Sequence, residues 1–203
     1  MNPITTGQSE FRSTKDVFFL DNDRFFASGN YTDGGISETG WMALWNFRRS
    51  ARPVWSRNLP HAPYSPTVTQ NQIAANLNRE IHFFDIKTGR SVDKRGQGID
   101  GFIVIGSTLI YSLKASRELY RLNLKDNSKQ LIPSKNRGSL MSLSTYAPDS
   151  LLVCRSSLYS DRLEKSSISI LNLSTGDERN ILTGFYGFPL ANLSKTRLLA
   201  VGF

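Results

Sequence analysis

The chain reads Phe83-Phe84-Asp85-Ile86-Lys87-Thr88-Gly89 at the stretch that decides its fold: an apolar run that ends in Asp, one more apolar residue, and a polar turn. The same order of residue types occurs in Leu44-Trp45-Asn46-Phe47, Leu122-Asn123-Leu124 and Leu171-Asn172-Leu173. Successive Asn or Asp residues of these segments lie 39, 38 and 49 residues apart. A repeat of about 40 residues is typical of stacked four-stranded units. The sequence therefore predicts an all-β array.

Short apolar runs and turn residues alternate along the rest of the chain. Runs rich in Phe, Ile, Leu, Val and Trp are separated by Gly, Pro, Asn, Asp or Ser, and no window shows a sustained helical period. This pattern is typical of strands joined by turns. We expect four repeats of four antiparallel strands, named A to D in chain order. They cover roughly residues 16–59, 64–95, 101–133 and 139–183.

The four Asn or Asp residues are expected near the ends of the strands C. Side-chain oxygens of Asn and Asp accept hydrogen bonds from nearby turn amides, so Asn46, Asp85, Asn123 and Asn172 should occupy equivalent positions. A long loop is expected between strands B and C of the first repeat. An insertion over residues 156–166 explains the longer period of the fourth repeat, because such insertions map to loops of an array.

Two segments resemble turns of β-propeller blades. Asp85-Ile86-Lys87-Thr88-Gly89-Arg90 is similar to the Asp-x-x-Thr-Gly turn of quinoprotein-type blades, and Ala147-Pro148-Asp149-Ser150-Leu151-Leu152 is similar to the Ser-Pro-Asp-Gly turn of TolB-like and WD-type blades. The resemblance implies a β-propeller of four blades plus parts of a fifth, incomplete or part of a larger propeller. No Trp-Asp dipeptide closes a strand C, and the blades do not repeat the Trp of quinoprotein-type blades, which argues against a quinone cofactor.

The two ends together suggest parts of a fifth blade. Residues 185–203 restart the pattern with strands A and B, and residues 4–13 resemble the turn and strand D of a blade. The strand C of that blade is missing. An unpaired strand edge recruits another strand, so we expect this open blade to pair with another chain.

Composition bounds the class of protein. The 203 residues contain a single cysteine, no span of apolar residues long enough to cross a bilayer, and no basic segment followed by an apolar stretch at the N-terminus. We therefore expect a chain without disulfides and, by default, a cytoplasmic location. Lys and Arg number 25 against 17 Asp and Glu, a net charge of +8. Such an excess favours an anionic partner, and it also keeps a protein in solution.

The basic residues gather at the connections between strands C and D. Those of the first two repeats are Arg48, Arg49, Arg52, Lys87 and Arg90. Because all C–D turns emerge on the same face of a propeller, these five residues are the candidate site for an anionic partner, nucleic acid included. Against this, the connections between blades also carry Lys94, Arg95, Lys135 and Arg137, so the asymmetry between the faces is weak.

No constellation of catalytic, cofactor or metal-binding residues is recognisable. Residues 96–101 match G-x-G-x-x-G, but a dinucleotide site needs a helix after the glycines and a β-like segment follows here. Residues 21–23 are acidic and amidic but lack the spacing of a calcium loop, so we expect a hairpin turn. His61 and His82 lack ligand partners at suitable spacing, and Cys154 is interpreted as a buried apolar residue.

These observations predict a non-catalytic binding or scaffold module without a cofactor, whose partner is a protein or an anionic molecule. The alternative is the propeller portion of a larger enzyme, either TolB-like and peptidase-associated or similar to a quinoprotein dehydrogenase. Function on a repeat scaffold lies in variable loops rather than in the repeated core. The sequence therefore predicts the architecture more sharply than the ligand.

Overall fold

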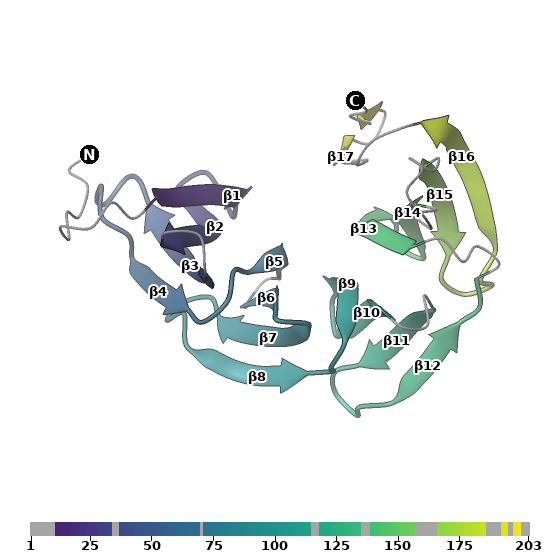
Figure 1. The fold of residues 1–203 in the computed structure, drawn as a ribbon, viewed down its shortest axis with the longest axis horizontal. Helices are drawn as coiled ribbons and strands as arrows, with labels where there is room; N and C mark the ends of the chain where they lie inside the picture. The colour runs from purple at the N-terminus through teal and green to yellow at the C-terminus, as the bar shows by residue number, and fades with distance from the viewer. Residues whose placement is uncertain are drawn as a thin grey trace. The chain divides into compact units, whose positions relative to one another are not determined.

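The computed structural model describes residues 11–33, 37–69, 71–114, 118–134, 139–156, 166–185, 192–194 and 197–199, and all regular elements among them are β-strands (Figure 1). The chain divides into two compact units, Met1–Gln97 and Gly98–Phe203. Each unit holds two four-stranded sheets in which every neighbouring pair is antiparallel. Within the described segments, no helix long and apolar enough to span a bilayer occurs.

The first sheet has the order β1-β2-β3-β4. Its strands are β1 (Phe11–Phe19), β2 (Arg24–Asp33), β3 (Ser37–Asn46) and β4 (Trp55–Leu59). Successive side chains of a strand point to opposite faces of a sheet. One face of this sheet therefore presents Phe18, Phe26 and Leu44, and the other presents their neighbours in sequence.

The second sheet has the order β5-β6-β7-β8. Its strands are β5 (Tyr64–Val68), β6 (Gln72–Leu77), β7 (Glu80–Asp85) and β8 (Ser91–Arg95). The inner strands β6 and β7 are largely buried: residues 73–77 of β6 and Ile81, Phe83 and Phe84 of β7 have little exposed surface. A cluster of buried side chains joins this sheet to the first one. It consists of Phe26, Met42, Leu44, Trp55, Leu59, Ile73, Ala75, Leu77, Phe84 and Ile86.

In the second unit, one sheet has the order β12-β11-β10-β9 and the other the order β13-β14-β15-β16. The first comprises β9 (Ile99–Ile105), β10 (Thr108–Leu113), β11 (Leu119–Asn123) and β12 (Lys129–Ile132). The second comprises β13 (Ser139–Ala147), β14 (Ser150–Ser156), β15 (Ser166–Asn172) and β16 (Glu178–Phe185). Their shared core consists of Ile103, Ile110, Leu119, Ile132, Leu140, Leu151, Val153 and Leu171.

A two-stranded antiparallel sheet follows, formed by β17 (Asn192–Ser194) and β18 (Arg197–Leu199). These strands lie in the stretch expected to begin a fifth blade. Residues 4–10, 157–165 and 200–203, on which the rest of that blade and most of the insertion were expected, lie outside the described residues, as do Lys135 and Arg137.

The structure differs from expectation in three places. Strand β1 begins at Phe11, so residues 11–13, expected in strand D of the fifth blade, pair with Thr32, Tyr31 and Asn30 of β2. The expected long loop after β2 is short, because β2 continues to Asp33 and β3 begins at Ser37. Lys94 and Arg95, expected in a connection, belong to β8 and pair with β7. In each case the segment pairs with a neighbouring strand of its own sheet, and this context decides its structure.

Candidate functional site

The expected equivalence of the four Asn or Asp residues is confirmed. Asn46, Asp85, Asn123 and Asn172 are the last residues of β3, β7, β11 and β15. In each, a side-chain oxygen accepts a hydrogen bond from the backbone N–H two residues ahead, at 3.2, 3.1, 3.0 and 2.8 Å respectively. In all but Asn123 the same oxygen also accepts the N–H three residues ahead. We call these four residues the turn anchors.

A second hydrogen bond recurs next to each anchor and ties the C–D turn to the A–B turn of the same sheet. The residue after the anchor donates its N–H to a carbonyl of the turn between the first two strands. The four bonds are Phe47 to Asp23 at 3.0 Å, Ile86 to Asn71 at 3.0 Å, Leu124 to Ser107 at 2.8 Å and Leu173 to Asp149 at 2.8 Å. Both turns of each sheet therefore lie at one end, which we call the turn end.

The five candidate basic residues lie at the turn ends of the first unit. Arg48, Arg49 and Arg52 belong to the β3–β4 turn, and Lys87 and Arg90 to the β7–β8 turn; all five are exposed. We call residues 47–54 and 86–90 the basic turns. Each turn's backbone is held by its anchor, so the structure presents these charges on ordered rather than loose segments.

The β7–β8 turn is fastened to strand β4, which follows the β3–β4 turn. The indole Nε1 of Trp55 donates to the carbonyl of Ile86 at 2.9 Å, and the guanidinium of Arg57 donates to the carbonyls of Gly89 and Thr88 at 3.3 and 3.1 Å. Gly89 has a φ of +65°, and a Cβ there would lie 2.6 Å from the Trp55 ring. These contacts join residues about thirty positions apart, so periodicity could not have revealed them.

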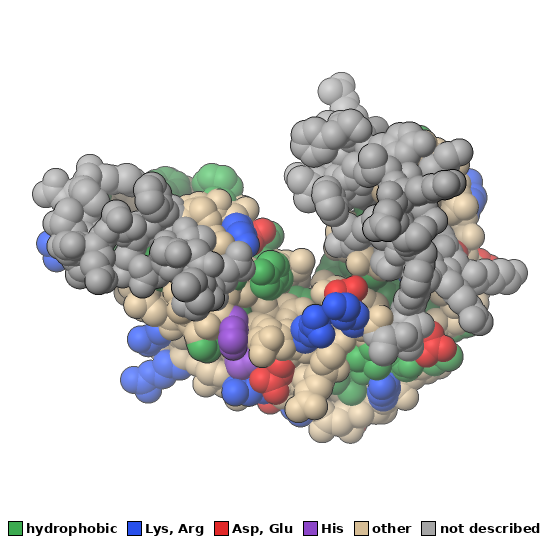
Figure 2. All heavy atoms as spheres, viewed as in Figure 1, with side chains coloured by type: hydrophobic (Ala, Val, Ile, Leu, Met, Phe, Trp, Pro, Cys, Tyr) green, Lys and Arg blue, Asp and Glu red, His purple; other side chains and the backbone are tan. Residues whose placement is uncertain are grey.

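Charges on the two basic turns are partly compensated. Arg48 Nε lies 2.6 Å from Asp23 Oδ1. Hydrogen bonds from the Thr88 hydroxyl, and then from the turn amides, hold the pKa of the Asp85 carboxyl below its ordinary value. Arg49 and Arg52 have no ion pair within the described ranges. On the face visible in Figure 2, Lys and Arg side chains stand in small groups among uncharged and acidic ones rather than in one continuous patch.

Residues 21–23 form the β1–β2 turn, as expected. The Asp21 carboxylate accepts the N–H groups of Asp23 and Arg24 at 2.9 and 2.8 Å and lies 2.7 Å from the Arg24 guanidinium, and Asp23 pairs with Arg48. Both carboxylates are engaged within the chain. No group of three or more His, Cys, Asp or Glu side chains suited to a metal occurs in the parts of the chain that the structure describes.

The other candidates from the sequence are the glycine motif of residues 96–101, the two histidines and Cys154, and the structure gives each of them a structural environment. The segment after Gly96 and Gly98, both at positive φ, is strand β9 and not a helix. His61 is an exposed loop residue, whereas the His82 Nε2 lies 2.9 Å from Glu80, and burial lowers the pKa of His82. Cys154 is fully buried, which raises the pKa of its thiol.

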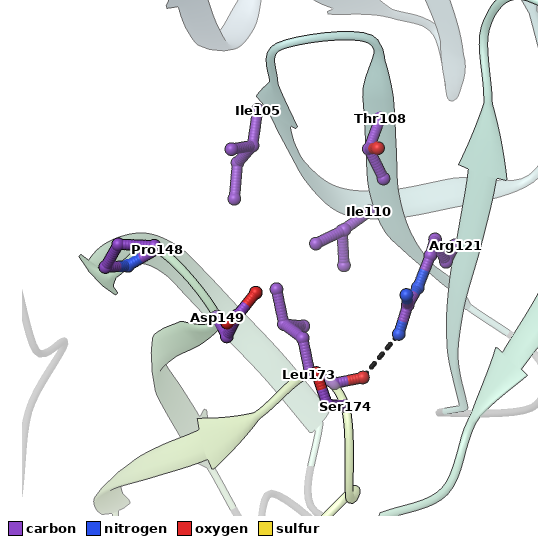
Figure 3. A pocket seen from close by; sticks show the side chains of 8 residues that line it. All are labelled: Ile105, Thr108, Ile110, Arg121, Pro148, Asp149, Leu173 and Ser174. Carbon is purple, nitrogen blue, oxygen red and sulfur yellow. Dashed lines mark hydrogen bonds between the residues drawn. The ribbon is translucent and has the colours of Figure 1, made fainter.

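A small pocket lies at the turn end of the second unit (Figure 3). It has a volume of about 140 Å³. Its lining consists of Ile105, Thr108, Ile110, Arg121, Pro148, Asp149, Leu173 and Ser174. Leu173 and Ile110 point into the space, and Arg121 flanks it and donates through Nη2 to the carbonyl of Leu173. The Nε of Arg121 is buried and has no partner among the residues described. Sequence patterns did not single out this pocket.

Comparisons with solved structures identify the fold. The chain is similar to the N-terminal domain of Nup159, with 14% identity, a TM-score of 0.60, and coverage of 89% of this chain and 52% of that chain. A chain in the complex of S. cerevisiae Dbp5 bound to Nup159, Gle1, IP6 and ADP gives 15% identity, a TM-score of 0.58, and coverages of 87% and 52%. The chain is also similar to Kluyvelomyces marxianus Hsv2, with 12% identity, a TM-score of 0.55, and coverage of 86% of this chain and 52% of that chain.

These solved structures are β-propellers, and the likeness shows that the chain has a β-propeller fold. The chain spans about half the length of the solved structures that it matches. No protein-family model and no curated protein matches the sequence.

Proposed function

We propose that the chain is a non-catalytic binding module whose partner is a protein with an acidic surface, held by the two basic turns. The observation that carries the proposal is the placement of Arg48, Arg49, Arg52, Lys87 and Arg90, all exposed, on two turns whose backbones are fixed by Asn46 and Asp85. Charges on ordered turns recognise a partner with less loss of conformational freedom than charges on loose loops.

The fold is compatible with this role. In one of the similar solved structures Dbp5 is bound to Nup159, so a chain of this fold type is known in a protein complex. The turn geometry supports a finer resemblance as well. Asp85 accepts N–H groups from Lys87 and Thr88, and Gly89 takes positive φ, in the segment whose sequence resembles the Asp-x-x-Thr-Gly turn of quinoprotein-type blades.

The test neutralises the five basic residues together by substitution with Gln and measures binding to heparin and to duplex DNA as polyanion probes. Binding through five charges releases about five counterions, so affinity for duplex DNA should fall roughly 500-fold between about 50 and 200 mM salt. The five-residue variant should lose most of this dependence.

A matched control variant removes the same charge from other exposed positions. These positions are Lys15, Lys94, Lys114, Lys125 and Arg179. It should retain the wild-type affinity and salt slope. Equal losses in the two variants would mean that net charge and not the basic turns causes binding, and absence of any binding would also refute the proposal.

A further inference from the structure

The first sheet carries a row of aromatic side chains on the face opposite to its core. Phe25 stacks on Trp45 with 5.1 Å between ring centroids and an angle of 1°, and Phe19 and Phe47 lie 6.3 and 6.5 Å from Phe25. Trp41 meets the edge of Trp45 at 6.3 Å. Strand register explains the row, because Phe19 pairs with Phe25 and Phe25 pairs with Trp45. We call these five residues the aromatic face.

Much of this surface is in contact with solvent. Phe19 is 76% exposed and Phe47 is 53% exposed, and Val17, on the same face, is 50% exposed. Since a buried Phe removes about 150–250 Å² from water, the two Phe side chains alone expose roughly 250 Å². Exposed apolar side chains gathered on one face of a sheet, rather than scattered singly, form a candidate interaction site.

Equivalent positions in the second and fourth sheets are covered. In each sheet, the residue before the anchor pairs with a residue of the second strand. These pairs are Trp45 with Phe25 in the first sheet, Phe84 with Ile73 in the second and Leu171 with Leu151 in the fourth. In the second and fourth sheets, both members are at most 4% exposed and pack against the preceding sheet of their unit. In the first sheet both are only half-buried. This face of a sheet is therefore built to receive another β-structure.

The surroundings of the aromatic face indicate the charge of its occupant. Phe47 is the first residue of a basic turn, which also contains the exposed residues Arg48, Arg49 and Arg52. Arg48 is paired with Asp23, but Arg49 and Arg52 have no ion pair in the described part of the chain. A second copy of the chain would bring like charges together, whereas Asp or Glu side chains of a different protein would complement them.

We propose that the aromatic face binds a β-strand segment of a partner protein that alternates apolar with acidic residues. The inference rests on the proposed function and deepens it, because it makes the partner a protein and gives it an apolar anchor. Apolar side chains of the segment lie on Phe19, Phe25 and Phe47, and its carboxylates meet Arg49 and Arg52. Aromatic and Arg side chains are the residues that dominate protein interfaces.

The probe is a short synthetic peptide that alternates Leu with Glu, compared with peptides that alternate Ser with Glu and Leu with Lys. The Leu–Glu peptide should bind at least tenfold more tightly than either. The double variant Phe19→Ser/Phe47→Ser should weaken its binding at least tenfold. A control variant, Val92→Ser/Leu131→Ser, changes two other exposed apolar residues, which are 52% and 48% exposed, and should bind like the wild type. Thermal unfolding confirms that each variant is folded.

Several results would overturn the inference. Equal binding of the Ser–Glu peptide would reduce the interaction to charge alone, and equal binding of the Leu–Lys peptide would exclude an acidic partner. Self-association that the Phe variant abolishes would make a second copy the occupant. A monomer that binds none of the peptides would mean that the face is not a docking site.

The two proposals fail differently. If the proposed function is wrong, the variant that lacks the five charges binds heparin as tightly as the wild type does. If the inference is wrong and the proposed function is right, Leu–Glu binding depends on the five charges but is unchanged by Phe19→Ser/Phe47→Ser.

Discussion

The buried ion pair of the second unit is the place where a single substitution should cost the most stability. Arg155 on β14 and Glu178 on β16 have side chains that are 1% and 3% exposed, with 3.3 Å between Arg155 Nε and Glu178 Oε1. The hydroxyls of Ser134 and Ser169 also donate to the Glu178 carboxylate. We therefore expect Glu178→Ala to be strongly destabilising.

The magnitude follows from what the substitution leaves behind. Removing one partner of a buried pair leaves the other charge without its counterion, which typically costs about 3–5 kcal/mol. The two hydroxyls lose an acceptor as well, which keeps the estimate near the upper end of that range, about 4–5 kcal/mol. Domains are stable by only about 5–15 kcal/mol in total. By contrast, Asp93→Asn breaks the partly exposed pair with Arg95 and should cost less than about 1 kcal/mol.

Urea unfolding followed by two probes measures the effect. All three Trp residues, Trp41, Trp45 and Trp55, belong to the unit Met1–Gln97, so their fluorescence reports that unit while far-ultraviolet circular dichroism reports both. A shift in circular dichroism alone would show that the units unfold separately. A Glu178→Ala variant within about 1 kcal/mol of the wild type, or equal to Asp93→Asn, would refute the reasoning. The apolar double variant Arg155→Met/Glu178→Leu should recover most of the loss.

Three further predictions concern single residues. Asn172→Ala removes hydrogen bonds to the amides of Ser174 and Thr175 and should cost about 1–2 kcal/mol in urea unfolding, whereas Asn180→Ala, exposed on β16, should cost little. Burial raises the pKa of Asp16 above its ordinary value of 3.8, so its contribution to stability is present at low pH and is lost as the pH rises through the raised pKa. Asp16→Asn should therefore gain stability relative to the wild type towards neutral pH and not below pH 3.8. The Cys154 thiol, fully buried and with a raised pKa, should react with a disulfide reagent only at the rate of unfolding; fast labelling of the native protein would contradict this.

Local patterns were enough to predict most of the strands. The predicted four sets of four antiparallel strands are present, because turn residues flank short apolar runs along the chain. The turn anchors were predictable for the same reason, since an Asx side chain bonds amides two or three residues ahead and needs no distant partner. The position of the five candidate basic residues on C–D turns followed from these anchors.

Contacts between distant residues were not predictable. Gly29 and the glycines near it suggest a loop, but Gly29 lies within β2, where a Cβ would be 2.8 Å from the Trp41 Nε1 and even closer to the backbone of Ser13. The glycine is thus needed for close approach in a sheet and not for a turn. Likewise, the contact of Trp55 in β4 with the site of Gly89 in the β7–β8 turn, and the ion pair of Arg155 in β14 with Glu178 in β16, join elements that are not paired strands, and local patterns do not encode such contacts.

Departures from the repeat indicate candidate sites more directly than the repeat itself. Two residues before the anchor, β3 and β7 have Leu44 and Phe83, each 2% exposed, because an apolar side chain there fills the core. At the same position β11 has Arg121, whose guanidinium reaches across to the Leu173 carbonyl and flanks a cavity of about 140 Å³. The aromatic face arises in the same manner, since positions that are closed core in the second and fourth sheets hold half-buried rings in the first. A repeat fixes which positions must be apolar for packing, so a charged or exposed residue at such a position has to be explained by something outside the repeated core.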